Sequence, residues 1–98
     1  MKIKEGVIMA GLQLEMRPVL KAADRLWKQY GEELVVTSAL DGTHSAGSLH
    51  YYGLALDFRT RYFPDGVAFE ASEVLQDALG PDFRVIYEGT HIHVQKVI

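Results

Sequence analysis

The chain contains no cysteine, no long apolar run and no excess of positive charge. The absence of cysteine excludes disulfide bonds, thiolate metal sites and thiol nucleophiles, so any metal must be held by histidine and carboxylate side chains. No apolar stretch approaches the length of a membrane-spanning helix. The formal net charge is −3, which argues against nucleic acid and against a membrane as partners, because both select strongly basic surfaces.

The length of 98 residues fits one domain spanning residues 1–98, and 48% apolar residues suit a folded globule. We expect a monomer. The N-terminal segment has a basic start, but Glu5, Gly6 and Gly11 interrupt its apolar part. This pattern is a poor match to a signal peptide, so the sequence predicts a protein that is cytoplasmic as synthesised.

Two segments show the three- and four-residue spacing of an amphipathic helix. The first runs from Met16 to Tyr30, with Pro18 in its first turn and Gly31 after its end. The second starts near Asp65 and ends before Gly80.

Four segments are predicted to be strands: residues 34–37, 53–58, 83–87 and 91–97. The last two are separated by three residues and should pair as a hairpin. An additional N-terminal strand is possible, and residues 39–49 read as a loop. The fold class is therefore α+β, with a small, largely antiparallel sheet and helices packed on one side.

Three of the four histidines lie on or beside predicted strands, close to acidic residues. His91 and His93 are two residues apart on one strand, so both point to the same face, and Asp57 lies on the polar face of another strand. His50, Asp57 and one histidine of the pair would supply two imidazoles and one carboxylate, which is a common first shell for catalytic zinc. Glu88 is placed to take a proton from a zinc-bound water, and the unligated histidine of the pair could stabilise an oxyanion. Spacing alone does not separate this site from a set of surface histidines.

Residues 48–57, SLHYYGLALD, resemble the S-x-H-x-x-G-x-A-x-D motif of the D-Ala-D-Ala carboxypeptidase group of zinc peptidases. Residues 87–94, YEGTHIHV, resemble the second motif of that group, an acidic residue followed by H-x-H. Residues 36–51 are also similar to the signalling domain of hedgehog proteins, which shares this fold. Together the resemblance covers residues 34–97.

The resemblance implies a role for each matching residue. His50, Asp57 and His93 would bind Zn2+, Glu88 would be the catalytic base, and His91 would be the unligated histidine beside the metal. An assignment with His91 as the ligand stays open, because related dipeptidases place an acid three residues before the ligand itself.

Three further residues are candidates for substrate binding. Ser48 matches a residue that helps to hold the substrate. Peptidases of this group often carry an arginine after the first strand, and residues 38–41 contain none. Arg59 could substitute for it. His44, six residues before His50, either lines the cleft or is a loop histidine without a task.

These resemblances imply a zinc metallopeptidase that hydrolyses peptide bonds in peptidoglycan stem peptides, as a D-Ala carboxypeptidase or a murein endopeptidase. We expect it to act on the cell wall after release or export, as a phage-derived lysis protein would. Two alternatives stay open: a zinc-containing but non-catalytic hedgehog-like binding module, and a metal-free structural protein. Glu88 favours the enzyme, because a binding module needs no acid beside the metal.

Overall fold

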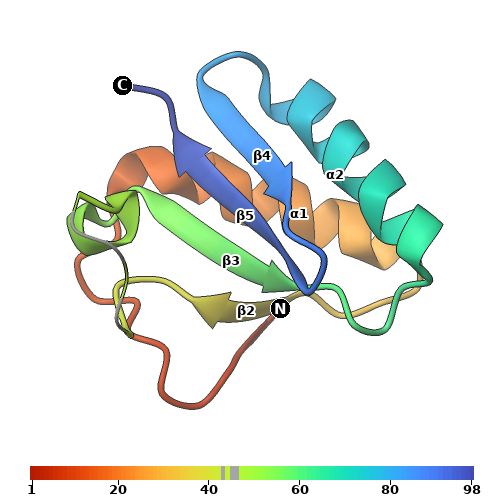
Figure 1. The fold of residues 1–98 in the computed structure, drawn as a ribbon, viewed down its shortest axis with the longest axis horizontal. Coiled ribbons are helices and arrows are strands. Elements are labelled where there is room, and N and C mark those ends of the chain that lie inside the picture. Colours follow the sequence, from red (N-terminus) through yellow and green to blue (C-terminus); the bar gives the residue numbers. More distant parts are fainter. Residues whose placement is uncertain (43, 45–46) are drawn as a thin grey trace.

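A five-stranded mixed sheet and two α-helices make up the protein in a computed structural model, which describes residues 1–42, 44 and 47–98 (Figure 1). Part of the predicted 39–49 loop therefore lies outside the described residues. The strands are β1 (Lys2–Ile3), β2 (Val35–Ser38), β3 (Ala55–Arg59), β4 (Phe83–Tyr87) and β5 (His91–Lys96). The helices are α1 (Arg17–Gln29) and α2 (Asp65–Leu79), with short 3-10 helices η1 (Leu14–Met16) and η2 (Leu49–Tyr52). The predicted α+β class is confirmed.

The strand order is β1-β2-β3-β5-β4, so β3 and β5 are neighbours although α2 and β4 separate them in sequence. All pairs are antiparallel except β1–β2, which is parallel. The predicted hairpin is confirmed as β4–β5, and β1 supplies the additional N-terminal strand. In the β3–β5 register, Asp57 stands opposite His93, and Arg59 stands opposite His91.

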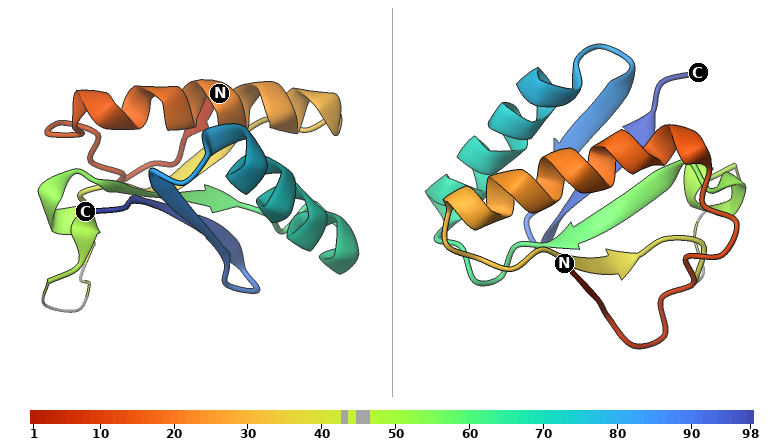
Figure 2. Two further views of the ribbon diagram at one scale, coloured as in Figure 1. Left: turned by 90° about the horizontal axis from the view of Figure 1, so that it is seen from above. Right: turned by 180° about the vertical axis from the view of Figure 1, so that it is seen from behind.

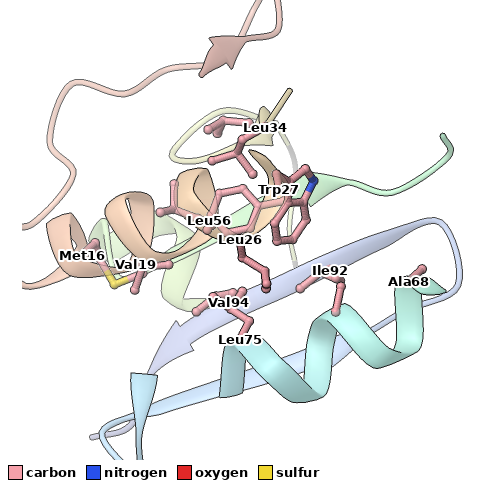
Figure 3. Packing of buried hydrophobic residues seen from close by; sticks show 14 of the residues in the cluster. Met16, Val19, Leu26, Trp27, Leu34, Leu56, Ala68, Leu75, Ile92 and Val94 are labelled. Carbon is pink, nitrogen blue, oxygen red and sulfur yellow. The ribbon is translucent and has the colours of Figure 1, made fainter. Parts of the chain in front are cut away.

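The two faces of the sheet have different tasks. Leu56, Phe58, Ile92 and Val94 are fully buried against α1 and α2, which lie on the same face of the sheet (Figures 2 and 3). Successive strand residues point to opposite faces, so the residues between them in β3 and β5 face away from the core. The core packing therefore places Asp57, His91 and His93 together on the face of the sheet opposite α1 and α2.

Helix α1 anchors this core. Its buried stripe follows the predicted spacing and consists of Met16, just before the helix, and Val19, Ala23, Leu26 and Trp27. The Trp27 ring meets Phe58 and Phe63 edge to face, with centroids 5.9 and 5.7 Å away, an arrangement that adds to the burial energy. Within the described residues, neither helix has both the length and the apolar character needed to cross a membrane.

Gly53 joins η2 to β3 at a point where no side chain fits. Its φ is +70°, and a Cβ built on it would collide with the carbonyl oxygen of Gly11. The backbone N–H of Gln13 also donates to the Gly53 carbonyl at 3.0 Å. This motif glycine is therefore required by the close approach of the N-terminal segment, which holds the turn that carries His50.

Candidate metal centre

Three side chains from separate elements converge on the face of the sheet opposite α1 and α2. His50 comes from η2, Asp57 from β3 and His93 from β5, and one ligand atom from each lies within 4.8 Å of the others. Asp57 Oδ1 is 3.3 Å from His50 Nε2 and 2.8 Å from His93 Nδ1. The structure thus brings together the three residues that the sequence analysis proposed as ligands.

A hydrogen bond to the backbone, on the side of the ring away from Asp57, fixes the orientation of His50. Its side chain is buried, and its Nδ1 lies 2.7 Å from the carbonyl oxygen of Ala39. A carbonyl only accepts hydrogen bonds, so Nδ1 carries the proton. In the neutral ring, the lone pair then lies on Nε2, the atom that faces Asp57. Metal-binding histidines are typically oriented in this way, by a hydrogen bond from the other ring nitrogen.

In His93 the two ring nitrogens exchange roles relative to His50. Its Nε2 is 2.8 Å from Oε1 of Gln95, and its Nδ1 is the atom that faces Asp57. With Nε2 donating to the amide oxygen, the lone pair of the neutral ring lies on Nδ1. Gln95 was missed in the sequence analysis, although strand alternation places it on the same face as His93.

The two lone pairs and the carboxylate therefore point at one another, and this arrangement requires a positive charge between them. Without a metal, a proton supplies that charge. Burial lowers the pKa of His93, but the hydrogen bond to Asp57 outweighs it and holds this pKa above its usual value. Burial likewise raises the pKa of Asp57, but its contacts with His50 and His93 depress this pKa well below the usual range.

A divalent metal ion fits the same position, so the group formed by His50, Asp57 and His93 could bind one. Ligands about 2.0–2.1 Å from a tetrahedral ion stand roughly 3.3 Å apart. The His50–Asp57 distance of 3.3 Å already matches this spacing. The shorter His93–Asp57 contact is a direct hydrogen bond that the metal would replace.

Two polar residues stabilise the loop that holds His50. Asp41 Oδ1 accepts hydrogen bonds from the backbone N–H groups of Ala39 at 2.9 Å and Ile8 at 3.1 Å, which fixes the carbonyl that orients His50. Ser48 Oγ accepts from the backbone N–H of His50 at 3.3 Å and caps η2. The motif serine thus has a structural task besides its place in the cleft. Asp41 was missed as a positioning residue, because its partners come from the folded backbone.

His91 and Glu88 lie beside the three-residue group. His91 Nε2 is 3.8 Å from Asp57 Oδ2 and 3.6 Å from Glu88 Oε1, and its Nδ1 is 2.9 Å from Thr90 Oγ1. His91 is not part of the group whose ligand atoms lie within 4.8 Å of one another, which consists of His50, Asp57 and His93. The geometry therefore favours His93 over His91 as the ligand.

A cleft of about 650 Å³ opens over the group. Its lining residues are His44, Gly47, Ser48, Leu49, His50, Asp57, Ile86, Glu88, His91, His93 and Gln95. His44 lies in the cleft, with its ring stacked on His50 at a centroid distance of 4.1 Å. Arg59 lies outside it and lines a neighbouring hollow. The candidate arginine is therefore beside the cleft, and the other predicted site residues line it.

Comparison of the sequence with known protein families and with curated proteins gives no match. The fold and the site define a small α+β protein with a candidate metal centre of two imidazoles and one carboxylate. Its similarity to zinc peptidases rests on the two motifs and remains a prediction.

We predict that the protein binds one zinc ion and that His93, not His91, is a ligand. His93→Ala should weaken zinc binding about 100-fold or more, since loss of a direct ligand costs at least as much as loss of an outer-shell partner. His91→Ala, the matched control two residues away, should bind nearly as the wild type does. Isothermal titration calorimetry measures the zinc affinity of both variants. A larger loss of affinity in His91→Ala than in His93→Ala would identify His91 as the ligand.

The metal-free protein should be most stable between about pH 4 and 6.5. The lowered pKa of Asp57 contributes stability above its unfolded value, and this contribution is lost as pH falls through the folded pKa. The raised pKa of His93 contributes stability below its unfolded value, and this contribution is lost as pH rises through the folded pKa. Urea unfolding in the presence of a chelator measures the profile. His93→Gln should remove the decline above pH 6.5, and an unchanged decline would mean that another group causes it.

Proposed function

We propose that the protein is a zinc-dependent peptidase that hydrolyses peptide bonds in peptidoglycan stem peptides. The observation that carries this proposal is the convergence of two imidazole lone pairs and one carboxylate at the floor of a cleft whose wall includes Glu88. Two nitrogen ligands and one oxygen ligand are a common donor set for catalytic zinc, and three protein ligands leave a coordination position open.

Zinc bound at such a site supplies a water whose pKa is lowered to about 7. Glu88 is half-exposed in the cleft wall and free to approach this water. With zinc bound, Glu88 would accept one proton of this water as the water oxygen adds to the peptide carbonyl carbon. When the carbon–nitrogen bond breaks, Glu88 would pass that proton to the departing amine nitrogen. The new carboxylic acid would lose the second proton of the water to solvent, which leaves a carboxylate and an amine.

His91 supports the same step without binding the metal. Its Nε2 lies in the cleft wall near Asp57 and Glu88, where it could donate a hydrogen bond to the carbonyl oxygen of a bound peptide. A hydrogen bond to the developing negative charge on the carbonyl oxygen lowers the barrier more than the same bond in the ground state.

The rest of the cleft suits a short peptide with small side chains. Ser48, His44 and Gln95 offer polar groups to a peptide backbone, and Leu49 and Ile86 offer apolar contacts to methyl groups. Together with the two motifs, this lining favours stem peptides, which are rich in alanine. A non-catalytic, zinc-containing binding module remains the alternative, and the place of Glu88 in the cleft wall favours the enzyme.

Glu88→Gln should cut purified peptidoglycan about 10²–10⁴-fold more slowly than wild type, because it removes the proton acceptor and keeps the shape. Its zinc affinity should stay unchanged, since Glu88 is outside the ligand group. Mass analysis of the released fragments gives the rate and the bond cut. Glu73→Gln, an exposed site on α2, is the matched control.

Two results would count against this proposal. Equal cutting by wild type and Glu88→Gln would remove Glu88 from the mechanism. Failure of the zinc-loaded wild type to release any fragment would refute the peptidase and favour the binding module.

A further inference from the structure

A second hollow, of about 330 Å³, lies next to the cleft, and the two cavities share Asp57 and His91 as a common wall. Three cationic side chains line it: Lys4, Arg59 and Arg61. We call it the basic hollow. Hydroxyl-bearing side chains from β2 and the β4–β5 turn complete its lining.

The fold assembles the three cations from separate segments. Arg59 is on the same face of β3 as Asp57 and stands opposite His91 on β5. Arg61 follows two residues later, in the turn after β3. Lys4 arrives from the N-terminus, because the backbone N–H of Lys4 donates to the Val36 carbonyl at 3.0 Å and extends the β1–β2 pairing.

One carboxylate, that of Asp57, lines the basic hollow beside the three cations. Over residues 1–42, 44, 47–64 and 66–98, no carboxylate oxygen lies within 4.0 Å of the cationic nitrogens of Lys4, Arg59 or Arg61. This is notable in a chain with 13 acidic and 10 basic residues. Three like charges around one cavity repel one another, and a bound anion would relieve that repulsion. Arg59 is also partly buried, and burial strengthens its interaction with an anion.

We infer that the basic hollow binds a carboxylate group of the peptide substrate, beside the bond that is cut. The inference rests on the proposed function, because the shared wall of Asp57 and His91 would put a carboxylate held there next to the reacting carbonyl. A substrate would then extend from the cleft across the metal centre to the basic hollow. Guanidinium groups bind carboxylates through paired hydrogen bonds, so Arg59 and Arg61 suit this task.

Stem peptides offer two sources of this carboxylate: the C-terminus and the side-branch carboxylate of the glutamate residue. Three peptides distinguish them: one with both carboxylates free, one with the C-terminus amidated, and one with the glutamate carboxylate amidated. The zinc-loaded wild type should show a KM about 10-fold higher for one of the two amidated peptides. That peptide identifies the carboxylate that the basic hollow binds.

Arg59→Gln should raise the KM for the free peptide about 10-fold and leave kcat within a few-fold. For the amidated peptide whose KM is raised in wild type, Arg59→Gln should leave the KM unchanged. The carboxylate that Arg59 would bind is already absent from that peptide. Arg25→Gln makes the same charge change at an exposed site on α1, across the sheet. This control should match wild type on all three peptides. Equal effects of Arg59→Gln on all three peptides would overturn the inference.

The inference is also testable without turnover. Calorimetry of the free-carboxylate peptide with zinc-loaded protein should give weaker binding for Arg59→Gln than for Arg25→Gln. If Arg59→Gln binds this peptide more weakly than Arg25→Gln but the wild type cuts nothing, the peptidase proposal is wrong and carboxylate binding in the basic hollow is supported. If the wild type cuts the peptide and the two variants bind it equally, carboxylate binding in the basic hollow is refuted and the peptidase proposal is supported.

Discussion

The pairing of Asp57 with His93 across β3 and β5 is the contact on which the site depends. It exists because the two strands are neighbours in one register, with Asp57 opposite His93 and Leu56 opposite Val94. A slip of one residue would turn the carboxylate into the core and expose the apolar side chains. The burial of Leu56, Phe58, Ile92 and Val94 therefore fixes the chemistry on the other face of the sheet.

Three residues around this pairing restrict the orientation of the two histidine rings. Ala39 and Gln95 accept the outer N–H of His50 and His93, and Asp41 holds the backbone of Ala39 in place. These contacts direct both lone pairs at the carboxylate before any metal arrives. Such preorganisation strengthens metal binding, because little reordering is left for the ion to impose.

The order of apolar and polar residues within single segments was sufficient to predict the helices, the β4–β5 hairpin and the face of Asp57. Helix spacing and strand alternation both depend only on residues close in sequence. The adjacency of β3 and β5 was not visible there, and the two motifs alone implied it. Asp41 and Gln95 were missed because their task depends on partners that only the fold supplies. Lys4 joins the site through a two-residue strand too short to give a clear pattern. Arg59 was expected in substrate binding, and the fold places it in the neighbouring basic hollow.

Zinc-edge X-ray absorption on the zinc-loaded protein, combined with a crystal structure at the same edge, tests the central claim most directly. We expect one ion bound by His50 Nε2, Asp57 and His93 Nδ1 at about 2.0–2.1 Å, with an exchangeable oxygen in the remaining position. A zinc ion coordinated elsewhere, or a site closed by four protein ligands, would contradict the account.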